Sequence, residues 1–254
     1  MKPELNELVE ISRFYGKNKE YVIAGGGNTS FKDEHIIWIK ASGKALAELD
    51  ENGLVALDRE KLHIISGKTY SDEPVKREEE VKNDLFGSII DPGRDTRPSV
   101  ETSLHELIRY KFVVHLHPTL INSVLCSRNA KNLTIKLFGE KVLFVPYTDP
   151  GYTLFKKLES EITKYRDQYS SDPQIIFLEN HGSFVGADST EEIKSIYEQI
   201  LSAIGTQVSP LSDIEELHYN PVLFKVLPAL RMLLSDDKVK VIRCRNNTLI
   251  SRYY

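Results

Sequence analysis

Short apolar runs alternate with helically spaced apolar residues along the second half of the chain. The run that ends at His117 has the length of a buried strand and is stopped by Pro118, while Pro98 suits the first turn of a helix. Strands are predicted at 112–117, 142–145 and 175–178, and helices at 98–108, 118–126, 152–166 and 190–204. The alternation is typical of an α/β fold, although the order alone does not decide between a parallel and a mixed sheet.

The first half of the chain is less regular. The pattern predicts an amphipathic helix over 3–14, short strands at 36–39 and 55–57, a solvated helix over 73–84 and a loop over 91–97. A glycine-rich stretch, Gly25–Ser30, precedes the first strand. After residue 206 we expect a helical segment and a final strand or extended arm at Val239–Ile242.

Composition places the chain among globular enzymes. Its 254 residues are 41% hydrophobic, which is enough to bury one large core. A net charge of -4 predicts no general attraction to nucleic acid or to an anionic membrane. The two cysteines lack metal-motif spacing, and no signal peptide or long apolar run is evident, so a cytoplasmic protein is expected.

His115 and His117 are the first candidates for chemistry. Side chains two apart in a strand point to the same face, so both imidazoles can reach one metal ion. The alternative to metal binding is that the two residues are partly buried histidines that only form hydrogen bonds. A second apolar run leads into His181, with Gly182 permitting a turn. Three neutral imidazoles with an open fourth position suit catalytic zinc.

Two further sets of residues suggest proton transfer and anion binding. Glu101 lies on the predicted helix that begins at Pro98, and His105 follows one turn later, where it can support the carboxyl group. Gly25–Ser30, the Ser42-Gly43 turn and Ser99 offer free backbone amides and short polar side chains, which suit an anion. A structural loop is equally compatible with the first of these, Gly25–Ser30.

These motifs together resemble the class II aldolase/adducin family. The resemblance covers roughly residues 5–205 and is carried, in order, by Gly27-Asn28-Thr29-Ser30, Ser42-Gly43, Pro98-Ser99-Val100-Glu101, His115-Leu116-His117-Pro118, Pro146-Tyr147 and Asn180-His181-Gly182. The first and third motifs are especially similar to the aldolase portion of proteins in which a rhamnulose-phosphate aldolase is fused to a dehydrogenase. We therefore expect a layered α/β/α fold with a mainly antiparallel or mixed central sheet. The expected organisation is a single domain over 1–254, with a C-terminal extension at 206–254.

The resemblance implies a zinc-dependent aldolase, with another divalent cation possible, that cleaves a ketose phosphate to dihydroxyacetone phosphate and an aldehyde. Its metal ligands would be His115, His117 and His181, and Glu101 would be the acid/base. The phosphate would lie among five residues: Gly27, Asn28, Ser42, Gly43 and Ser99. A cyclic homotetramer is also implied.

Departures from the family pattern leave alternatives open. Val100 stands where related enzymes often have a second serine, so the ligand could carry a carboxylate in place of a phosphate. No tyrosine in 129–144 matches the second acid/base of fuculose-phosphate aldolase, although Tyr147 and Tyr219 are candidates across a subunit boundary. An epimerase, a decarboxylating aldolase and a catalytically silent, adducin-like assembly domain are the other functions considered. Retention of Glu101 with all three histidines favours an enzyme.

Overall fold

The structure is a computed structural model that describes residues 2–92, 96–207 and 222–235. Contacts between residues divide the chain into two units, Met1–Gln207 and Val208–Tyr254. In the second unit, the described helix α9 spans Val222–Leu234. The strand or arm expected at Val239–Ile242 lies outside the described residues, and the single-domain organisation stays a prediction.

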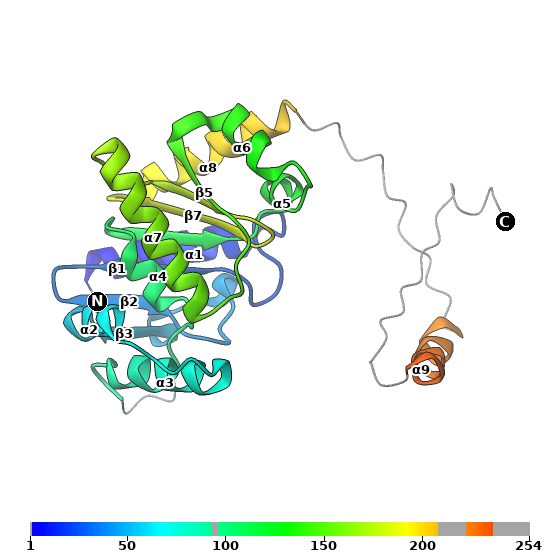
Figure 1. The fold of residues 1–254 in the computed structure, drawn as a ribbon, viewed down its shortest axis with the longest axis horizontal. Helices are drawn as coiled ribbons and strands as arrows, with labels where there is room; N and C mark the ends of the chain where they lie inside the picture. Colours follow the sequence, from blue (N-terminus) through cyan, green and yellow to red (C-terminus); the bar gives the residue numbers. More distant parts are fainter. Residues whose placement is uncertain (1, 93–95, 208–221, 236–254) are drawn as a thin grey trace. The chain divides into compact units, whose positions relative to one another are not determined.

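The first unit is built on one mixed sheet of seven strands in the part of the chain described (Figure 1). Their order is β3-β2-β1-β4-β7-β6-β5, and only the pair β5–β6 is parallel. The strands are β1 (Asn28–Lys32), β2 (Ile36–Lys40), β3 (Leu54–Asp58), β4 (Phe112–Leu116), β5 (Val142–Val145), β6 (Ile175–Leu178) and β7 (Gly182–Ala187). The expected α/β fold with a mainly antiparallel, mixed sheet is confirmed.

Helices flank this sheet. The first unit contains α1 (Pro3–Gly16), α2 (Arg59–Gly67), α3 (Pro74–Gly87), α4 (Thr102–Leu107), α5 (Thr119–Leu125), α6 (Ala130–Phe138), α7 (Tyr152–Tyr169) and α8 (Thr190–Gly205). Helices α4 and α7 pack over one face, while α1 and α8 pack together on the other (Figure 1). The core under α7 joins Leu154 and Leu158 to Val113 of β4 and Phe184 of β7. Burial of such side chains is the main stabilising contribution to the layered arrangement.

Two strands, the start of one helix and two unpredicted helices, α2 and α6, differ from the sequence-based prediction. β1 lies where a glycine-rich loop was expected, and β7 follows β6 directly through a tight turn at Asn180. Helix α4 begins at Thr102 and not at Pro98, which leaves Glu101 at its N-cap position. The Ser99 hydroxyl accepts a hydrogen bond from the Glu101 amide, and Thr102 donates to the Ser99 carbonyl oxygen. These local bonds compete with helix formation and delay its start.

Strand direction determines where the candidate residues meet. Both β4 and β6 run antiparallel to β7, so the carboxyl ends of β4 and β6 lie at the same edge of the sheet. β1 is antiparallel to β4, with Asn28 opposite His115, so the first residue of β1 lies at this edge too. Among the described helices, none is long and apolar enough to cross a membrane.

Candidate active site

The three predicted histidines converge at this edge of the sheet. His115 is the fourth residue of β4, His117 follows the strand, and His181 lies in the turn between β6 and β7. One ring nitrogen from each lies within 4.8 Å of the other two, and the Nε2 atoms of His115 and His117 are 2.9 Å apart. The structure thus brings together the residues that the sequence pattern selected.

His115 is held with its Nε2 atom toward the other two rings. Its Nδ1 atom lies 3.1 Å from the carbonyl oxygen of Ser183, and the ring stacks on Phe184 with centroids 4.1 Å apart. Burial lowers the pKa of His115 to about 3, so the ring is neutral near pH 7. Nδ1 then carries the ring proton and donates a hydrogen bond to the Ser183 carbonyl oxygen. Nε2 keeps a free lone pair, as metal ligation requires.

The turn that carries His181 is shaped by two backbone positions. Asn180 adopts a φ of 57°, which asparagine tolerates better than most residues. A Cβ atom at Gly182 would lie 2.5 Å from Cδ2 of His117 and 2.6 Å from the carbonyl oxygen of Leu116. Glycine is therefore required here, because the start of β7 packs directly against the end of β4 and the His117 ring.

Glu101 lies beside the histidine cluster. Its Oε1 atom is 3.4 Å from Nε2 of His115 and 3.4 Å from Nε2 of His181. Burial raises the pKa of Glu101, but the imidazoles of His115 and His181 outweigh that effect and hold the pKa below its ordinary value. The carboxyl group is therefore ionised near neutral pH and can accept a proton.

A chain of hydrogen bonds supports Glu101 from behind. The Asn28 amide nitrogen donates to Oε2 of Glu101, and the Asn28 side-chain oxygen bonds Nε2 of His105. On the far side of the ring, Nδ1 of His105 lies 2.7 Å from the Ser30 hydroxyl. Burial keeps the pKa of His105 well below its ordinary value, so this ring too is neutral. His105 thus contacts Asn28, and Asn28 contacts the carboxylate.

The residues expected around an anion are grouped less tightly. Asn28 donates to the Ser99 hydroxyl over 3.3 Å, so Ser99, Asn28 and Glu101 form one contiguous group. The Ser42-Gly43 turn is tied to the segment before Ser99, because the Ser42 amide donates to the Arg97 carbonyl oxygen over 2.8 Å. Gly27, with a φ of 70°, lies under β4, where an added Cβ would be 2.8 Å from the His115 carbonyl oxygen.

Other candidates lie apart from the cluster. The Tyr147 side chain is 57% exposed and its hydroxyl donates to Asp149, so the structure does not bring it to Glu101. Tyr219 lies outside the described residues.

Sequence reasoning missed Lys40, Ser183 and the contact between Ser30 and His105. Lys40 is buried at the end of β2, and burial lowers its pKa. The Glu101 carboxylate is close enough to offset part of that effect by raising the pKa of Lys40. Ser30 could have been found from strand alternation, because Asn28, Ser30 and Lys32 share one face of β1. Nothing in the local sequence marks the Ser183 carbonyl oxygen as the partner of His115, because that contact is between strands.

The donor set fits a divalent cation. Three imidazoles converge, one is oriented by a backbone carbonyl oxygen, and a carboxylate lies next to them. The Nε2 atoms of His115 and His117, 2.9 Å apart, can share a hydrogen bond between neutral rings, and both can turn their lone pairs to one cation. His115, His117 and His181 are the residues that would hold the ion.

Comparison with known proteins identifies the family. Residues 6–208 match the family described as Class II Aldolase and Adducin N-terminal domain, and the chain belongs to it. The N-terminal class II aldolase domain of a conserved protein from Thermoplasma acidophilum superposes with a TM-score of 0.67 and 26% identity, covering 82% of this chain and 95% of that one.

Two curated relatives extend the comparison. The chain is 28% identical, over 94% of its length, to the uncharacterized oxidoreductase YuxG of Bacillus subtilis, and it spans 36% of that relative's length. It is 25% identical to the L-fuculose phosphate aldolase of Methanocaldococcus jannaschii, with 65% of this chain and 74% of that protein covered.

Proposed function

We propose that this protein is a metal-dependent carbon-carbon lyase that cleaves a ketose phosphate to dihydroxyacetone phosphate and an aldehyde. The observation that carries the proposal is the ionised Glu101 carboxylate within 3.4 Å of two of three convergent imidazoles. The family and the similarity to a fuculose phosphate aldolase support it. Zinc suits three histidines best, and another divalent cation is compatible with the same donors.

Glu101 moves the proton in this mechanism. A divalent cation held by the three histidines would supply Lewis-acid polarisation of the substrate. In the cleavage direction, Glu101 takes the proton of the hydroxyl group whose carbon becomes the aldehyde, and after the carbon-carbon bond breaks it passes that proton to the carbon of the resulting enediolate; condensation reverses both transfers. Asn28 holds the carboxylate in place for this transfer by donating a hydrogen bond to Oε2.

The phosphate would bind at the group formed by Gly27, Asn28, Ser42, Gly43 and Ser99. Short polar side chains and free amides at a turn suit an oxyanion. Val100 is 70% exposed beside this group and supplies no hydroxyl, so one donor of the phosphate-binding pattern is missing. A carboxylate-bearing substrate is therefore the alternative at this position.

A panel of ketose phosphates that includes fuculose-1-phosphate and rhamnulose-1-phosphate, assayed for triose phosphate, tests the function. The parent should release dihydroxyacetone phosphate from one of them, and Glu101→Gln should retain its metal and lose turnover. Glu140→Gln, an exposed glutamate on another element, is the control and should keep full activity. Undiminished cleavage by Glu101→Gln would exclude the proton-transfer role.

The same assay separates the alternatives. Conversion of a sugar phosphate to its stereoisomer without triose release would indicate an epimerase, and release of carbon dioxide would indicate a decarboxylating aldolase. A protein that binds no divalent ion and turns over nothing would instead fit an adducin-like assembly domain.

Assembly and location are part of the proposal. We expect a cyclic homotetramer in which a residue of one chain completes the site of its neighbour, as closed symmetry permits, and a cytoplasmic protein. Light scattering on active, metal-loaded protein should give the tetramer mass. A monomer mass with full turnover would place every catalytic group within one chain.

A further inference from the structure

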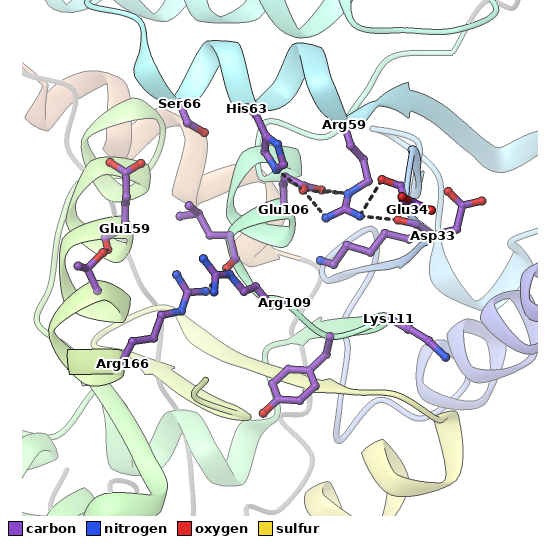
Figure 2. Close-up of a pocket in the computed structure, with 14 residues that line it drawn as sticks. Asp33, Glu34, Arg59, His63, Ser66, Glu106, Arg109, Lys111, Glu159 and Arg166 are labelled. Carbon is purple, nitrogen blue, oxygen red and sulfur yellow. Dashed lines mark hydrogen bonds and ion pairs between the residues drawn. The ribbon is translucent and has the colours of Figure 1, made fainter. Parts of the chain in front are cut away.

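A second hollow lies at the opposite end of β1 and β4 from the histidine cluster. We call it the basal pocket; the cations in its lining are Lys32, Arg59, Arg109, Lys111 and Arg166 (Figure 2). Its volume is 870 Å³, which is in the range of small-molecule sites. Asn28 and Lys32 are the two ends of β1, so about 13 Å of strand separates the pocket from the candidate active site.

Three of the four acidic side chains that line the pocket have cationic partners, and the fourth, Glu34, is exposed and has no ion pair among the described residues. Glu106 is nearly buried and is bound by Arg59 through two nitrogens and by His63 at 3.0 Å. Asp33 pairs with Lys2 at 2.7 Å outside the pocket, and Glu159 pairs with Lys156. Their charges are therefore not available to the remaining cations of the lining.

Lys32 is the buried cation of the lining, and among the described residues no ion pair joins its ammonium group to a carboxylate. Its side chain is buried, and its ammonium group donates to the carbonyl oxygen of His105, the only hydrogen bond that the structure gives it among the described residues. Burial lowers the pKa of Lys32 to about 7 even though Glu106 raises it. A buried ammonium with two unused donors is costly unless an anion reaches it.

Arginines provide further donors around the same space. Arg109 is exposed and has no side-chain partner within the described part of the chain, and Arg166 is bound to Asp172 and the Leu107 carbonyl oxygen. Figure 2 shows Arg109 and Arg166 on one side of the pocket and Arg59 across from them. Guanidinium groups suit oxyanions because they present planar pairs of donors.

We propose that the basal pocket binds the phosphate group of a small molecule between Lys32 and Arg109. Its volume exceeds what inorganic phosphate needs, so the natural ligand is a phosphorylated metabolite-sized compound. The site is separate from the one at Ser42 and Ser99, and it does not rest on the aldolase activity.

Two measurements on the full chain test this site. Crystals soaked in tungstate, a heavy phosphate analogue, should show an anomalous peak between Lys32 and Arg109. Calorimetric titration with inorganic phosphate, in a Ser42→Ala/Ser99→Ala background that disables the other candidate site, should still show binding. Adding Arg109→Gln should weaken that binding at least tenfold, whereas Lys131→Gln on α6, with the same loss of charge, should not change it.

Either measurement can overturn the proposal. A tungstate peak confined to the Ser42 and Ser99 region, or no peak at all, would exclude the basal site. Equal phosphate affinity with and without Arg109→Gln would do the same. Arg109 is exposed, so its replacement is not expected to disturb folding, and Lys32→Met is the second variant that must also abolish the tungstate peak.

Discussion

His105 fixes which way the Asn28 amide points. The Asn28 nitrogen donates to Glu101, so its oxygen must face His105, and Nε2 of the neutral His105 ring must carry the proton that this oxygen accepts. Nδ1 then accepts from the Ser30 hydroxyl. The three contacts select one tautomer and one amide orientation, which presents a donor to the Glu101 carboxylate.

Replacing His105 by Phe should therefore impair turnover without emptying the metal site. Phe keeps much of the ring volume but cannot donate to Asn28, so the amide is free to rotate and present its oxygen to Glu101. We expect kcat to fall about 10- to 100-fold, the range typical of groups that orient a ligand or base, with little change in KM or metal content. Steady-state kinetics on the substrate identified by the panel measures this.

His105→Gln provides the rescue control for that variant. A Gln amide can donate to the Asn28 oxygen, so activity should recover in part relative to His105→Phe. If both variants lose kcat equally and also lose metal, His105 serves only to hold the core together.

His117→Ala should remove the bound metal. Two remaining imidazoles bind a divalent ion far more weakly than three. His117 is only partly buried, so its replacement should disturb the fold less than replacement of the buried His115. Elemental analysis of purified protein should show metal near one equivalent in the parent and little in the variant, with an unchanged circular dichroism spectrum. His63→Ala, at an exposed histidine outside the cluster, should retain the metal.

Gly182→Ala should weaken metal binding through geometry alone. The added methyl group would lie 2.5 Å from the His117 ring and 2.6 Å from the Leu116 carbonyl oxygen, so the ring or the strand must shift. We expect at least a tenfold lower affinity, measured by competition with a chelator. Gly67→Ala is the matched control because nothing lies within 4 Å of its added Cβ; equal affinities for both variants would contradict the prediction.

Lys32→Met should stabilise the protein most at neutral and lower pH. Burial lowers the folded-state pKa of Lys32 to about 7 from an unfolded value near 10.5, so between these values the unfolded chain holds a proton that the folded chain lacks. The stability of the parent therefore rises with pH across this window, and the advantage of methionine shrinks.

Urea unfolding at pH 6.5 and pH 9.5, in buffers without phosphate, measures that difference. Lys111→Met, at an exposed lysine of the same pocket, should show little effect at either pH. If Lys32→Met raises the free energy of unfolding by the same amount at both pH values, the ammonium charge is not what destabilises the folded state.

The histidine cluster was predictable because its pattern is local. His115 and His117 share a strand face by spacing alone, and a second apolar run pointed to His181. The position of Glu101 at a helix N-cap was not predictable from periodicity, since the hydroxyls of Ser99 and Thr102 displace the start of α4. The glycines before Asn28 obscured β1, whose strand conformation depends on pairing with β2 and β4 and not on local propensity.

The alternating side chains of β1 leave no room for an insertion or a deletion within this strand. Asn28, Ser30 and Lys32 lie on one face, with Asn28 contacting Glu101 and Lys32 lining the basal pocket. Insertion of a single residue within Asn28–Lys32 would reverse the facing of every residue on one side of the insertion. Asn28 and Lys32 would then no longer share a face, so one such change should separate the Glu101 contact from the basal pocket.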